Sequence, residues 1–161
     1  MMTPRPSTRT PLQAVLSSPR TLAAWALLGY VALFLFFEFF QLVLPGGGSF
    51  SGRAAGANFR ALLIMAMPVL AVLLVGYVAP ALSGARLICM VALIEYGVAM
   101  VFGLLTLLIG LPAIMDGINS GHGGLGSLRY FVMGAGELVL ILIAAYVVLR
   151  ALTGRRDGPQ R

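Results

Sequence analysis

Four long apolar stretches, separated by shorter polar segments, dominate the hydrophobic pattern of this sequence. They cover about residues 22–44, 61–79, 87–111 and 128–149. A helix that crosses a ~30 Å hydrocarbon core needs about 20 predominantly apolar residues. The stretches are continuously apolar, without the alternation of membrane-barrel strands, so helices are favoured. The pattern therefore predicts an all-α, polytopic membrane protein built as an antiparallel bundle of four transmembrane helices.

The remaining segments divide the chain into one membrane domain with two polar tails. The predicted units are a disordered N-terminal tail (residues 1–20), the transmembrane domain (21–152) and a C-terminal tail (153–161). The tails contain too few apolar residues to pack by themselves. The first apolar run is longer than the core of a signal peptide, so we expect it to remain as a membrane span.

The loops between the predicted spans differ in length. A short segment, 80–85, predicts a tight hairpin between the second and third spans. The glycine-rich segments 45–52 and 112–127 predict two longer loops on the opposite side of the membrane. Neither is long enough to fold as a separate domain.

Composition agrees with a membrane location. Hydrophobic residues make up 60% of the 161 residues and charged residues only 10%, with a mean hydropathy of +0.98. A soluble domain carries about 25% charged residues, and a disordered chain has low hydrophobicity, so both classes are excluded.

The arginines predict the orientation of the bundle. With four spans, both tails and the hairpin 80–85 share one side. That side holds eight arginines, Arg5, Arg9, Arg20, Arg86, Arg150, Arg155, Arg156 and Arg161. The other side holds three, Arg53, Arg60 and Arg129. The positive-inside rule therefore predicts cytoplasmic termini. The arginines are scattered at helix ends and form no basic face, so the net charge of +6 predicts no nucleic-acid partner.

Glu95 and Glu137 are the strongest candidates for a polar site within the membrane. Glu95 lies nine residues beyond Arg86, about 14 Å from the cytoplasmic edge, and Glu137 lies nine residues beyond Leu128, about 14 Å from the external edge. In a ~30 Å core both are therefore near the middle. Since the third and fourth spans are antiparallel, the two carboxyl groups are predicted to meet. Two buried carboxylates at close range cannot both stay ionised, so they would share a proton. This pair either fastens two helices, which we favour, or carries protons or cations, or the glutamates pair with another protein.

Two further polar residues fall within the predicted spans. Glu38 lies about 9 Å from the outer edge of the first span. Arg60 opens the second span and is a candidate partner for Glu38. Side chains lean toward the N-terminus of their helix, so these two are expected to lean apart. We therefore expect Arg60 to extend to the headgroups.

The residues that most enzymes use are nearly absent. The chain has one cysteine, one histidine (His122) and no lysine. It contains no nucleotide-binding loop, no metal-ligand spacing and no hydrolase signature. We therefore expect no enzymatic activity, no catalytic residues, no cofactor and no metal site.

Three stretches, together with the span pattern, carry a resemblance. They are Tyr30-Val-Ala-Leu-Phe-Leu-Phe-Phe-Glu-Phe39, Leu42-Val-Leu-Pro-Gly46 and Val91-Ala-Leu-Ile-Glu-Tyr-Gly-Val-Ala99. The sequence resembles small, uncharacterised four-helix membrane proteins of actinobacteria over most of residues 22–152. This resemblance implies a location in the plasma membrane and no established activity.

The sequence favours a non-enzymatic role. We expect a membrane scaffold or an accessory subunit that packs through small residues, such as Ala92, Ala99 and Gly103, with itself or with another membrane protein in the lipid bilayer. The alternative is a proton- or cation-linked transporter or channel component that uses the midplane glutamates.

Overall fold

The computed structural model describes residues 19–44, 48–76, 84–119 and 124–153, and these residues form helices and no strand. The helices are α2 (Pro19–Val43), α3 (Phe50–Gly56), α4 (Leu62–Gly76), α5 (Ala85–Asn119) and α6 (Gly124–Thr153). The predicted all-α class is confirmed for this part of the chain. Most of the N-terminal tail, nearly all of the C-terminal tail and most of the hairpin 80–85 lie outside the described residues.

Three helices are long and apolar enough to cross a membrane. They are α2, the Ala85–Pro112 part of α5 and the Leu125–Thr153 part of α6. The chain is therefore a candidate multi-pass membrane protein. Helix α4 is equally apolar but has 15 described residues, which reach about 22 Å at 1.5 Å per residue. That is less than the ~30 Å of a hydrocarbon core, so the predicted second span, 61–79, stays a prediction.

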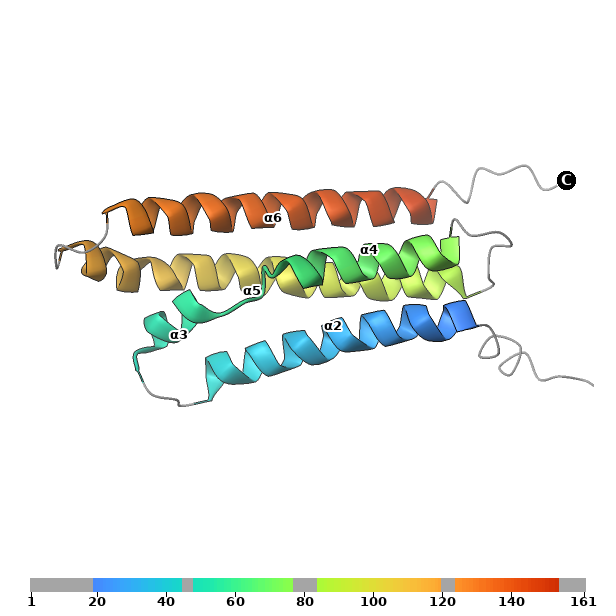
Figure 1. The fold of residues 1–161 in the computed structure, drawn as a ribbon, viewed down its shortest axis with the longest axis horizontal. Coiled ribbons are helices and arrows are strands. Elements are labelled where there is room, and N and C mark those ends of the chain that lie inside the picture. The colour runs from blue at the N-terminus through green and yellow to red at the C-terminus, as the bar shows by residue number, and fades with distance from the viewer. Residues whose placement is uncertain (1–18, 45–47, 77–83, 120–123, 154–161) are drawn as a thin grey trace, which may run out of the picture.

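The helices form an elongated bundle with α5 at its centre. Helix α5 packs against every other helix, most extensively against α6 and α3. Helix α2 packs mainly against α4, and in Figure 1 it lies across the bundle from α6. The start of α2 and the end of α6 lie at the same end of the bundle (Figure 1). This arrangement agrees with an antiparallel course of the chain.

Large apolar side chains lie on the surface of the bundle as well as in its core. The core contains small and branched residues that are essentially inaccessible, among them Ala24, Val31, Ala92 and Ile141. Large apolar side chains point outward along the whole length of α2, α5 and α6. In the most apolar 18-residue stretch of α6, only 17% is buried within the bundle. A water-facing surface of this kind would be unstable, so these faces are suited to lipid or to another membrane helix.

The predicted loop at 112–127 is wrong. Pro112 was expected to stop the third span, but α5 continues through it to Asn119, and α6 already begins at Gly124. Proline removes one backbone donor from the helix. Tertiary packing offsets this loss: at Gly110 an added Cβ would lie 2.9 Å from Cα of Ala55, so α5 is held closely against α3. Contacts with a neighbouring element therefore override the local breaking signal.

A short helix and a non-helical link precede α4, where the sequence predicted a loop followed by one continuous span. Ser49 caps α3, because its hydroxyl accepts a hydrogen bond from Gly52 N–H at 3.1 Å. After Gly56 the backbone becomes extended at Ala57, with φ −71° and ψ 136°. Helix α4 then starts at Leu62. We call residues 57–61 the α3–α4 link.

Candidate functional site

The α3–α4 link is the place where non-helical backbone enters the bundle. Its Phe59 and Arg60 are buried, with 0% and 7% of their surface exposed. Backbone outside a helix leaves N–H and C=O groups without partners, and such groups are tolerated at membrane depth only where protein or water covers them. Part of this need is met locally, because Ala57 N–H donates to the carbonyl of Ala54 at 3.3 Å and Ala61 N–H donates to that of Asn58 at 3.0 Å. Neighbouring helices supply further partners.

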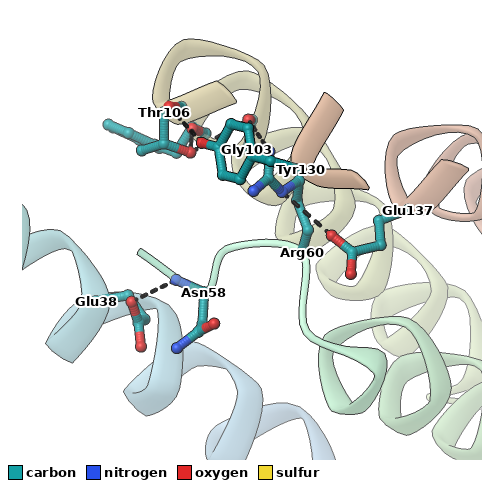
Figure 2. A network of polar contacts seen from close by, with 8 residues as sticks. Glu38, Asn58, Arg60, Gly103, Thr106, Tyr130 and Glu137 are labelled. Carbon is teal, nitrogen blue, oxygen red and sulfur yellow. Dashed lines mark hydrogen bonds and ion pairs between the residues drawn. The ribbon is translucent and has the colours of Figure 1, made fainter. Parts of the chain in front are cut away.

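Glu38 of α2 supplies one of these partners. Its Oε2 accepts a hydrogen bond from Asn58 N–H at 2.8 Å (Figure 2). Glu38 is 8% exposed whereas Asn58 is exposed, so this bond is only partly shielded from solvent. A hydrogen bond with one charged partner is about twice as strong as a neutral one. The carboxylate therefore fastens the link to α2.

Arg60 crosses from the link to α5 and α6. Its Nε lies 3.3 Å from Glu137 Oε2, an ion pair in which the N–H lacks hydrogen-bond geometry. Its Nη1 donates a long hydrogen bond of 3.5 Å to the carbonyl of Gly103. Its Cζ lies 5.4 Å from the centre of the Tyr130 ring, within the range of a cation–π contact (Figure 2). The guanidinium therefore joins three elements.

Tyr130 and Thr106 complete this arrangement. The Tyr130 hydroxyl donates to the carbonyl of Thr106 at 3.2 Å, which holds the ring beside Arg60. The Thr106 hydroxyl donates back to the carbonyl of Phe102 at 2.8 Å, within α5. We refer to Glu38, Asn58, Arg60, Gly103, Thr106, Tyr130 and Glu137 as the Arg60 network.

Two glycines make room for the arginine side chain. A Cβ added to Gly103 would lie 2.9 Å from Arg60 Cγ. A Cβ added to Gly134 would lie 2.9 Å from Arg60 Nη1 and 2.6 Å from Leu107 Cδ1. Real Cβ atoms do not approach other heavy atoms so closely, so larger residues at either position would displace the guanidinium.

The expected placement of Arg60 is wrong, and Glu38 does not pair with it. Arg60 was expected to extend toward headgroups, but it lies inside the bundle and pairs with Glu137. The prediction treated Arg60 as the first residue of a regular helix. Arg60 instead belongs to the non-helical link, so the direction in which helical side chains lean does not apply to it.

Glu95 and Glu137 are not brought together. Leu138 packs beside Gly103, so the adjacent Glu137 stands level with that turn of α5, about eight residues beyond Glu95. At 1.5 Å per residue this is about 12 Å along the helix. The prediction counted the depth of each glutamate from the start of its own span, Glu95 from Arg86 and Glu137 from Leu128, and assumed ~30 Å between the two starting points. The apolar part of α5, Ala85–Pro112, has 28 residues and is about 42 Å long, so the two starting points lie farther apart and Glu137 does not reach the level of Glu95.

Glu95 lies in a different environment. It is 6% exposed, and its Oε2 has no hydrogen-bond partner. It lines an apolar groove of about 440 Å³ between α2 and α5. The groove, which we call the Glu95 groove, is formed by Ala32, Leu35, Phe36, Phe39, Phe59, Ile94, Glu95, Val98 and Phe102. Glu95 is its single titratable lining residue.

Sequence reasoning missed three residues that shape these sites. Asn58 and Tyr130 belong to the Arg60 network, and Tyr96 donates from its hydroxyl to the carbonyl of Met65 at 2.6 Å. Tyr96 lies beside Glu95 and is 1% exposed, and its acceptor lies three residues before Pro68 of α4. A buried tyrosine hydroxyl needs a partner, and a proline within a helix disturbs backbone pairing nearby. The sequence signal that could have indicated this hydrogen bond is the presence of a tyrosine, Tyr96, and a proline, Pro68, within two apolar spans.

The sites differ in what they can do. The Arg60 network satisfies most of its own charges and hydrogen bonds, and it borders an open polar groove of about 450 Å³ that also includes Arg129. Among the residues that the structure describes, no three histidine, cysteine or carboxylate side chains lie close enough to hold a metal ion. Glu95 holds a buried acceptor without a partner beside an apolar groove. No known protein family, curated protein or solved structure matches this chain.

Proposed function

We propose that this chain is a non-enzymatic, multi-pass protein of the plasma membrane that serves as a scaffold or an accessory subunit of a membrane complex. The Arg60 network is the observation that carries the proposal. Its carboxylates, guanidinium and hydroxyls are directed at one another and at the freed backbone of the α3–α4 link. Polar groups used in this way stabilise a fold and leave few groups for chemistry on a substrate.

The outer faces support association. Gly97 of α5 and Gly136 of α6 are exposed, and an added Cβ at either position meets nothing within 4 Å. Small residues on a lipid-facing surface let a second helix approach closely. A second copy or another membrane protein is the proposed partner.

Co-purification from native membranes after chemical cross-linking tests this role. We expect a specific cross-linked product with the wild-type chain and a smaller yield with Gly136→Leu, which fills an outer face. Gly103→Leu serves as the contrasting variant, because it should lower thermal stability by disturbing the interior. If the wild type and Gly136→Leu are both monomeric and neither binds a partner, the scaffold role is contradicted.

A proton- or cation-linked transport component is the second candidate. Glu95 favours it, because a buried carboxyl without a hydrogen-bond partner is free to exchange a proton or to contact a cation. Proteoliposomes with an imposed pH gradient would distinguish the candidates. Transport predicts a flux that Glu95→Gln abolishes while the protein stays folded, and the absence of flux in wild type would remove this candidate for the isolated protein.

The orientation with cytoplasmic termini and the resemblance to small actinobacterial membrane proteins belong to the same proposal. In support, Arg20, Arg86 and Arg150 all lie near helix ends at the end of the bundle where α2 starts and α6 finishes. Positive charge at one end of a bundle favours its retention in the cytoplasm.

A further inference from the structure

The Glu95 groove combines an apolar wall with one unsatisfied carboxyl group. Phe39 and Phe59 each contact Phe102, with ring centres 5.4 Å and 5.3 Å apart. Phe36 and Ile94 stand at the surface, with 53% and 66% of their area exposed. The groove therefore opens on the apolar outside of the bundle.

The described chain has no donor of its own for Glu95. Its neighbour Tyr96 donates to Met65, and Arg60, which follows Phe59 in the link, pairs with Glu137. No basic side chain lines the groove. Oε2 is buried and without a hydrogen-bond partner, and the side chain to which it belongs lines the groove, so a donor from outside the chain can approach the Glu95 carboxyl group only from the groove.

The same features select the chemistry of an occupant. A carboxylate within an apolar environment gains most from a positively charged donor. Aromatic rings attract a cation as well as an apolar body. The groove volume of about 440 Å³ lies within the range of small-molecule sites, roughly 300–1,000 Å³.

We propose that the Glu95 groove binds a lipophilic ammonium ion, whose N–H donates to the Glu95 carboxyl while its hydrocarbon part lies against the phenylalanines. A lipid acyl chain would fill the groove but leave the Glu95 carboxyl group without a donor. A second copy of this chain has no lysine, and its described arginines lie near helix ends or, as Arg60, are already paired. A separate cationic ligand fits these observations better than either.

The test uses N,N-dimethyldodecylamine and its neutral isostere 2-methyltetradecane, with the full chain in lipid nanodiscs. Dicyclohexylcarbodiimide, an apolar reagent for carboxyl groups, labels Glu95, and peptide mass spectrometry measures the rate of labelling. We expect the amine to slow labelling roughly tenfold more than the alkane does, the ratio that one charge-assisted hydrogen bond provides. Equal protection by both compounds would overturn the proposal in favour of an acyl-chain site.

Two variants test whether the amine binds in the groove or elsewhere on α2. Phe36→Leu removes an exposed ring that lines the groove, and Phe37→Leu removes the adjacent exposed ring, which does not line it. We expect severalfold weaker protection by the amine in Phe36→Leu and wild-type protection in Phe37→Leu. An equal effect of the two substitutions would contradict binding in this groove.

Glu95→Gln tests the carboxyl group itself. The amine should raise the melting temperature of the wild type but not that of Glu95→Gln, because a ligand stabilises only the form that binds it. An equal rise in both proteins would overturn the proposal. If, without amine, the rate of Glu95 labelling falls as the density of protein in the membrane rises, the groove binds a second copy and the proposal is overturned. These readouts measure binding of the amine, so their outcome is independent of the flux and cross-linking tests of the proposed function.

Discussion

The two members of the central ion pair differ sharply in their surroundings. The Arg60 side chain is 8% exposed, whereas that of Glu137 is 41% exposed. A buried guanidinium without its counter-ion is costly, whereas a half-exposed carboxylate without its partner can be solvated. The pair is therefore asymmetric, and its contribution to stability depends mainly on keeping Arg60 neutralised.

This asymmetry predicts the order of stability in a mutant cycle. Glu137→Leu leaves the buried Arg60 charge unpaired and should lower the free energy of unfolding by about 1–3 kcal/mol. Arg60→Met should cost less, because the buried charge is removed, the bond lost to Gly103 is long, and the carboxylate left unpaired at Glu137 is half-exposed. The double variant should be more stable than Glu137→Leu alone, since neither charge remains. Thermal unfolding in one detergent measures all four proteins, and additive losses would show that the two side chains do not interact.

The hydroxyl group of Tyr96 leads to a second prediction about stability. Tyr96→Phe removes the hydroxyl that donates to Met65 and leaves a buried carbonyl with one partner fewer, near Pro68. We expect a loss of about 0.5–1.5 kcal/mol in stability. Tyr30→Phe is the matched control, because Tyr30 is 49% exposed and should tolerate the change. Similar melting temperatures for the two variants would argue against a structural role for the Tyr96 hydroxyl.

At the scale of elements, periodicity and length were sufficient to predict α2, α5 and α6 but not their ends. Pro112 and the glycines after it are local signals for a loop, and they were overridden by close packing of α5 on α3. The α3–α4 link was missed for the opposite reason. Its partners, Glu38 and Glu137, lie 20 and 77 residues away from the residues that they bind, Asn58 and Arg60. Contacts between such distant positions cannot be read from a local pattern.

An error in depth explains the error in the site. The predicted register came from two depths of about 14 Å, each counted from the start of its own span, with ~30 Å between the two starting points. The apolar part of α5 has 28 residues and is about 42 Å long, so Glu137 lies near Gly103 and Arg60 and not near Glu95. Identifying the intramembrane polar residues was thus possible from the sequence, while their partners required the register.

Close packing between α5 and α3 gives a prediction with a matched control. Gly110→Ala places a Cβ 2.6 Å from the Tyr130 hydroxyl and 2.9 Å from the backbone of Ala55, so it should cost about 1–3 kcal/mol of stability. Gly97→Ala lies on the same helix with nothing within 4 Å, and it should be neutral or stabilising by about 0.5–1 kcal/mol. Thermal unfolding measures both. Equal effects would contradict the close approach of the two helices.

At the scale of the whole molecule, the bundle has two chemically different ends. The first turn of α2, the first turn of α5 and the last turns of α6 each carry an arginine at one end. At the other end lie α3, the α3–α4 link and the polar groove that contains Arg129. The Arg60 network stands level with residue 103 of α5, about 17 residues and roughly 26 Å beyond Arg86. In a ~30 Å core that starts near Arg86, the network therefore lies toward the opposite interface, where the exposed side of Glu137 can reach water.

This polarity leads to a prediction about the orientation of the chain. Single cysteines placed at Phe50, the first residue of α3, and at Leu125, which is 84% exposed, should react with a membrane-impermeant thiol reagent added to intact cells. A cysteine at Thr153, at the opposite end of the bundle, should react only after the membrane is opened. The background protein carries Cys89→Ala, because Cys89 is the single native thiol and is 2% exposed. The positive-inside rule favours this orientation, since the arginine-rich end remains in the cytoplasm. Labelling of residue 153 but not of residues 50 and 125 in intact cells would reverse the orientation, and it would place the Arg60 network near the cytoplasmic interface.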